Sequence, residues 1–184
     1  VCQEGEWGVA MVKEGAEVKG IWTYFMKQKM GFRYVTMPNF VKFMGPYLPG
    51  TPSTTEQHQI LEELLTKIPP GASIKQDFHY SITNWLPLYW QNFQQTTRYT
   101  YLLDISDLQK VLDGVNRNIR RNIKKASEQI KIEHWDDPER FYVVNKMSFD
   151  RQNIPIPYTL TQFLRHDAAL NVQQRRKLFF AVDQ

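Results

Sequence analysis

The chain of 184 residues contains a single cysteine, Cys2. One thiol excludes an intrachain disulfide and any metal site built from several thiolates. A chain without disulfides is typical of a reducing compartment, so we expect a cytoplasmic protein. Glycine is also scarce in the second half, because none follows Gly114. This excludes a glycine-rich phosphate-binding loop from residues 115–184.

Long apolar runs are missing as well. The longest stretch without a formal charge, 78–97, has the length of a bilayer span, but it contains Pro87 and many Asn, Gln, Thr and Ser residues. The chain opens without the basic segment and apolar core of a signal peptide. We therefore expect no membrane span. Because the sequence starts without methionine and ends in a strand-like run, we also expect an incomplete chain.

Positive charge is present and concentrated in one place. Six basic and two acidic residues lie between Ser106 and Lys125, which gives a local charge of +4, equal to the net charge of the whole chain. The remaining residues are balanced. A localised positive face predicts an anionic partner, since clustered like charge attracts the opposite charge. The alternative interpretation, a solvated helix face without function, stays open.

The first half of the chain is organised as strands and one helix. Alternating apolar residues predict strands at 6–13, 17–26, 32–37 and 74–82. Apolar residues recur at helical spacing in 54–67, which predicts a helix. This order of elements indicates a mixed α/β domain. We expect one mixed sheet with the helix packed on it.

A strand at 99–104 and a long basic helix from Ser106 to about residue 130 are predicted next. The apolar residues of this helix follow the helical period. We expect four of them to be buried: Leu112, Val115, Ile119 and Ile123. Three basic residues on the other face should be exposed and, being three or four positions apart, could converge on one anion. These are Arg117, Arg121 and Lys124.

The last part of the chain is predicted to contain a strand at 130–135, helices at 138–150 and 159–174, and a final strand at 178–182. The final strand is apolar enough to require burial on both faces. We expect it to pair within its domain or to be covered by another copy, which would give a homo-oligomer.

Common catalytic signatures are missing from the sequence. It contains no nucleophile elbow, P-loop or H-E-x-x-H sequence. The four histidines lie far apart, so no metal site is expected. Asp150 and Asp183 are available carboxylates, but their spacing identifies neither as a general base, and the catalytic residues stay unknown. The aromatic residues of 85–101 are more often core than ligand platform in such segments.

Two sequences carry a family resemblance: T-R-Y-T-Y at 97–101 and R-R-N-I-K-K-A at 120–126. Upstream lie a strand with Trp7, then Y-V-T-M-P, M-G-P-Y and N-W-L-P sequences in that order. With these features the chain resembles the Fem-like branch of the GNAT acyltransferase superfamily. The resemblance covers nearly all of the chain.

The resemblance implies two GNAT-like α/β units, a complete one at 1–98 and the opening part of a second at 99–184. It requires a strand at 99–103, and a structure that is all helical or lacks that strand would refute the family assignment. It also implies transfer of an acyl or aminoacyl group from an activated ester or thioester to an amine, with no permanently bound cofactor. The donor, acyl-CoA or aminoacyl-tRNA, stays open, because the chain has no glycine loop of the kind that binds the CoA pyrophosphate.

Six residues are candidates for binding an anionic donor or a phosphate-bearing acceptor, because guanidinium groups match phosphate and carboxylate geometry. They are Arg98, Tyr99, Tyr101, Arg117, Arg121 and Lys124. The alternative function is a non-catalytic module that binds anionic ligands or nucleic acid through the basic helix, 106–130. The modest net charge and the lack of a nucleic-acid-binding motif speak against it.

Overall fold

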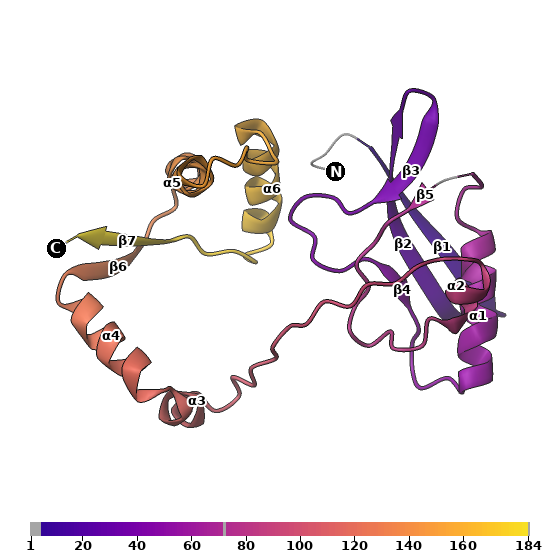
Figure 1. Ribbon diagram of the computed structural model, residues 1–184, viewed down its shortest axis with the longest axis horizontal. Coiled ribbons are helices and arrows are strands. Elements are labelled where there is room, and N and C mark those ends of the chain that lie inside the picture. Colours follow the sequence, from indigo (N-terminus) through magenta and orange to yellow (C-terminus); the bar gives the residue numbers. More distant parts are fainter. Residues whose placement is uncertain (1–4, 72, 184) are drawn as a thin grey trace. The chain divides into compact units, whose positions relative to one another are not determined.

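The computed structural model describes residues 5–71 and 73–183, and the chain divides into two compact units, 1–96 and 97–184. Each unit combines strands with helices (Figure 1), so the mixed α/β class that the sequence predicts is confirmed. Among the described residues, no helix has both the length and the apolar character needed to cross a bilayer.

The first unit is built on a mixed sheet with the strand order β1–β2–β3–β5. β1 (Glu6–Glu14), β2 (Glu17–Lys29) and β3 (Phe32–Thr36) are antiparallel neighbours, whereas β5 (Ser73–Ile74) runs parallel to β3. A further short strand, β4 (Gly45–Tyr47), pairs with β2. The first three predicted strands are confirmed, and so is their place in one mixed sheet.

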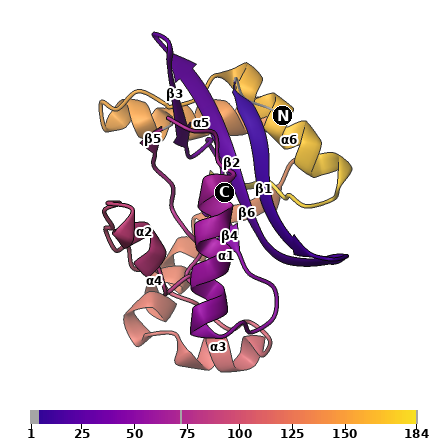
Figure 2. The same cartoon turned by 90° about the vertical axis from the view of Figure 1, so that its right-hand side faces the viewer.

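The core of this unit lies between the sheet and α1 (Thr54–Thr66), which covers one face of the sheet (Figure 2). Ser53 begins the helix with a capping box. The Ser53 hydroxyl accepts a hydrogen bond from the Glu56 backbone N–H, and the Glu56 carboxylate accepts one from the Ser53 backbone N–H. Three apolar side chains of α1 are buried: Ile60, Leu61 and Leu64. The helix predicted at 54–67 is thereby confirmed.

Gly20 of β2 allows this close packing. A Cβ atom at Gly20 would overlap Cγ2 of Ile60 and lie 3.2 Å from Cδ1 of Leu64. The absence of a side chain therefore lets α1 approach the sheet closely.

The predicted strand at 74–82 is wrong over most of its length, because the chain leaves the sheet after Ile74. Gln76 gives the reason. Its side-chain oxygen accepts a hydrogen bond from the buried Trp22 indole at 2.7 Å, and its amide donates to the Thr23 carbonyl at 3.2 Å. The Gln76 side chain thus anchors this segment to β2. Backbone hydrogen bonds from the Lys75 N–H to the Val35 carbonyl and from the Met44 N–H to the Asp77 carbonyl also hold it. A short helix, α2 (Leu86–Trp90), follows.

The second unit contains an antiparallel pair, β6 (Ile130–His134) and β7 (Phe179–Asp183). Next to this pair in sequence are α5 (Pro138–Arg151) and α6 (Leu160–Val172). Phe180 is buried, stacked on Trp135 with ring centroids 4.7 Å apart and edge-on to Phe141 at 5.9 Å. A stacked pair of rings, Phe141 and Phe163, joins α5 to α6. The predicted elements of this region are confirmed, including the pairing of the final strand within its unit. The expected burial of this strand on both faces is wrong, because Phe180 is buried whereas Phe179 on the other face is 60% exposed.

The predicted strand at 99–104 is wrong. Tyr99 and Tyr101 are 93% and 99% exposed, and no strand of the described residues pairs with this segment. Alternation of aromatic residues favours a strand, but a strand also needs a hydrogen-bonded neighbour. The missing strand removes one feature that the resemblance to the Fem-like family requires.

The long basic helix is also interrupted. It consists of α3 (Leu108–Gly114) and α4 (Arg117–Ser127), and Val115 between them has an extended backbone with φ −65° and ψ 128°. Asp107, not Ser106, caps α3, and its carboxylate accepts from the Lys110 backbone at 3.0 Å. The prediction of a single continuous helix is therefore wrong, because two helices occupy this segment.

An ion cluster links α6 to the segment between β6 and α5. The Arg176 Nη2 atom donates to Asp167 at 2.9 Å and to Asp136 at 2.6 Å. Nε of Arg176 lies 2.8 Å from Asp167 outside hydrogen-bond geometry, so that contact is electrostatic. The Arg176 and Asp167 side chains are only 9% and 7% exposed, whereas that of Asp136 is 61% exposed. The buried pair of Arg176 and Asp167 should therefore contribute more to the free energy of unfolding than the contact with Asp136.

Asp167→Ala should lower the free energy of unfolding by roughly 2–4 kcal/mol, because it leaves a buried guanidinium with one solvated partner. Asp136→Ala is the matched control, and it should cost less than about 1 kcal/mol. Urea denaturation followed by circular dichroism measures both. Equal costs for the two variants would contradict the assignment.

Candidate functional site

The break between α3 and α4 is stabilised by local caps. Asn116 begins α4, and its side chain accepts a hydrogen bond from the Asn118 backbone at 2.9 Å. An N-cap of this kind satisfies one of the first free N–H groups of a helix. The sequence therefore contains a helix start at Asn116, although the apolar spacing of the segment predicts one continuous helix.

Arg120 bridges the same break. Its Nε atom donates to the Val115 carbonyl at 2.9 Å, and its Nη2 atom donates to the Asp113 carbonyl. Carbonyls at the end of a helix have no intrahelical partner, and a cation also interacts favourably with them. Arg120 is thus a structural residue at the end of α3 and is set apart from the other cations of α4.

The basic face of α4 consists of Arg117, Arg121 and Lys124, which occupy positions i, i+4 and i+7 of the helix. This spacing places them on one side. All three are exposed, as predicted, and none forms an ion pair with an acidic residue in the described part of the chain. Their guanidinium and ammonium groups are available to an anion from solvent.

The apolar residues of α3 and α4 are not buried, contrary to the prediction. Leu112, Ile119 and Ile123 are 59%, 54% and 61% exposed, and Val115 is half-buried. The helical period is right for α4, since Ile119 and Ile123 lie one turn apart and away from the basic face. The helical period does not predict which surface, if any, packs against Ile119 and Ile123.

The other three predicted site residues lie in the irregular segment before α3. Arg98 is exposed, as are Tyr99 and Tyr101. No hydrogen bond or ring contact described in the structure joins the two tyrosines to Arg117, Arg121 or Lys124. The predicted set therefore divides into three residues on one helix face and three on an irregular segment.

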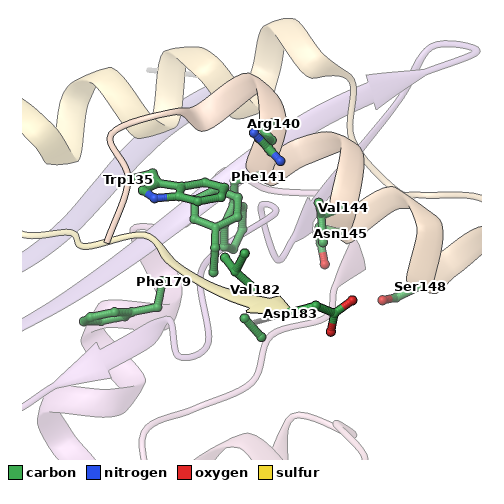
Figure 3. Close-up of a pocket in the computed structure, with 11 residues that line it drawn as sticks. Trp135, Arg140, Phe141, Val144, Asn145, Ser148, Phe179, Val182 and Asp183 are labelled. Atoms are coloured by element: carbon green, nitrogen blue, oxygen red, sulfur yellow. The ribbon is translucent and has the colours of Figure 1, made fainter. Parts of the chain in front are cut away.

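A cavity of about 420 Å³ lies in the second unit, beside β7 and α5 (Figure 3). Its lining is largely apolar and includes Trp135, Phe141, Val144 and all five residues of β7. None of the predicted binding residues lines it. The F-F-A-V sequence at 179–182 could have indicated this cavity. A strand with apolar residues on both faces needs a packing partner on each face.

Several polar groups around this cavity already have partners. Asn145 donates to the Tyr158 hydroxyl; burial raises the pKa of that hydroxyl, and the hydrogen bond acts in the opposite direction. The Trp135 indole donates to Glu133 at 2.8 Å, and the Arg140 guanidinium lies 4.5 Å from the Trp135 ring centroid. The cavity thus presents apolar walls and few free polar groups.

The available carboxylates show no catalytic geometry. Asp150 is bound to Lys146 at 2.6 Å, and Asp183 lies at the cavity rim with no described partner that would activate it as a base. Within residues 5–71 and 73–183, no group of three His, Cys, Asp or Glu side chains is placed to hold a metal ion. The basic face of α4 is therefore the strongest candidate for ligand binding.

Comparison with known proteins adds no further identification. No family model, curated protein or solved structure matches this chain.

The different roles of two neighbouring arginines can be tested directly. Arg120→Ala should accelerate amide exchange at the end of α3 roughly two- to fivefold, since it removes hydrogen bonds to two terminal carbonyls. Arg121→Ala removes the same charge but no described hydrogen bond, so exchange in α3 should not change. Hydrogen exchange followed by NMR measures both variants, and identical exchange would show that Arg120 does not hold the junction.

Proposed function

We propose that the basic face of α4 binds the phosphate or carboxylate groups of a substrate, and that this substrate takes part in acyl or aminoacyl transfer to an amine. The observation that carries the binding role is the exposure of Arg117, Arg121 and Lys124 on one side of a single helix, where none of them forms an ion pair with another described residue. The transfer reaction rests on the sequence resemblance to Fem-like GNAT proteins alone, and the part of the chain that the structure describes lacks the strand at 99–104 that this resemblance requires.

The first turn of α4 also favours an external anion. Arg117 opens the helix, and no acidic residue stands in the first turn. A cation near a helix N-terminus opposes the helix dipole, which attracts negative charge there. Local stability would favour Asp or Glu at this position. A bound anion would satisfy both the dipole and the arginine.

The basic face would act by positioning the substrate. In the proposed reaction, the amine nitrogen attacks the carbonyl carbon of an ester or thioester, a C–N bond forms and the C–O or C–S bond breaks. The amine proton passes to the leaving group or to solvent. Holding the charged part of the substrate would raise the rate through orientation of the reacting atoms. No residue of the described chain is assigned as general base.

Substrate binding can be tested with a double variant. Arg121→Ala/Lys124→Ala should weaken binding about 100-fold, if each lost charge-assisted hydrogen bond costs ~1.5 kcal/mol. Folding should be unaffected, because exposed charges contribute little to stability. Calorimetric titration with acetyl-CoA, an aminoacyl-tRNA and a nucleotide-linked amine measures the affinity.

The matched control is Lys29→Ala/Lys42→Ala, which removes the same charge from exposed positions in the first unit. If the α4 variant, the control and the parent bind with equal affinity, the basic face of α4 does not bind the substrate and is only a solvated surface. Mass spectrometry of the same mixtures then separates the two functions. Binding with formation of a new amide supports acyl transfer, whereas binding without turnover supports a non-catalytic module for anionic ligands or nucleic acid.

A further inference from the structure

In the part of the chain that the structure describes, β7 is paired along one edge only. It pairs with β6, from Phe179 opposite His134 to Asp183 opposite Ile130, and the described sheet of the second unit contains no other strand. The open edge therefore presents a row of backbone N–H and C=O groups. Such edges are templates for the addition of another strand.

The cavity of the second unit lies along this edge. It is lined by every residue of β7 but by none of β6, and α5 forms its other side (Figure 3). On α5, the cavity is lined by Phe141 and Val144 and by three polar residues, Arg140, Asn145 and Ser148. A strand added to β7 would therefore meet a helix surface that is part apolar and part polar, and could place side chains in existing space.

The sequence around β7 is complementary to itself. In an antiparallel pair centred on Phe180, Leu178 lies opposite Val182 and Phe179 lies opposite Ala181. Lys177 then lies opposite Asp183, and both are exposed. Residues directly opposite share a face, so apolar residues meet apolar ones on both faces and opposite charges meet at each end.

We propose that a second copy of this chain pairs through β7, antiparallel and about a two-fold axis at Phe180. The result is a continuous four-stranded sheet, β6–β7–β7–β6, with both copies of α5 on the same face. The half-exposed Phe179 side chain gains a cross-strand neighbour, Ala181 of the second copy. A two-fold contact of this kind closes on itself and leaves no further open β7 edge.

A second copy fits this edge better than an unrelated strand because of the end charges. When the strand meets its own sequence in this register, Lys177 and Asp183 form two opposite-charge pairs, one at each end. Centring the pair on Ala181 instead would place Asp183 opposite Phe179 and leave Lys177 without an acidic neighbour. The charges thus select both the partner and the register.

Charge reversal tests the proposal, with association measured by sedimentation equilibrium of the 184-residue protein. The parent should form a concentration-dependent dimer. Lys177→Asp or Asp183→Lys alone should weaken dimerisation roughly tenfold or more, because each creates two like-charge pairs across the axis. The double variant Lys177→Asp/Asp183→Lys should restore the parent affinity. Glu62→Lys, which changes an exposed residue of α1, is the control and should leave dimerisation unchanged.

Circular dichroism of every variant shows whether it has folded, and restoration by the double variant excludes misfolding as the cause of a loss. A parent that stays monomeric at all accessible concentrations would overturn the proposal. So would a dimer whose affinity is the same in the parent and in both single variants, because its contact would lie elsewhere.

Discussion

The second unit depends on the burial of Phe180 between Trp135 and Phe141. A two-stranded sheet is only marginally stable by itself, and it needs a helix on one face to persist. Phe180 supplies that contact from near the start of β7, and Phe141 continues it to Phe163 of α6. The aromatic contacts cover one face of the sheet, and β6 pairs with one edge of β7. Among the described residues, no strand pairs with the other edge.

The elements with strong periodicity were predictable from the sequence. β1, β2, β3, α1, α5 and α6 combine regular apolar spacing with caps or turns at their ends, and each carries the side chains that its packing uses. Two strand predictions were wrong because the alternation of apolar and polar residues does not indicate whether a neighbouring strand is present. After Ile74 the Gln76 side chain and a few backbone hydrogen bonds hold the segment instead of a continuous strand ladder. At 99–104 no described strand is a neighbour.

The candidate site was predictable in its charges but not in its construction. The exposure of Arg117, Arg121 and Lys124 follows from the helical period. The same period wrongly predicted α3 and α4 as one helix. The break between them depends on local hydrogen bonds, from Asn116 as the N-cap of α4 and from Arg120 to the Asp113 and Val115 carbonyls, and apolar spacing does not report these. The stripe with Ile119 and Ile123 shows that amphipathic spacing predicts an apolar face but not the surface that covers it.

The central claim is that the basic face of α4 is a binding surface for phosphate or carboxylate groups. The most direct measurement is a backbone amide NMR titration of the 184-residue protein with inorganic pyrophosphate and with acetyl-CoA. The account predicts saturable shift changes centred on Arg117, Arg121 and Lys124, with little change along β7. Changes centred on the cavity beside Trp135, or no saturable change on α4 with either ligand, would contradict it.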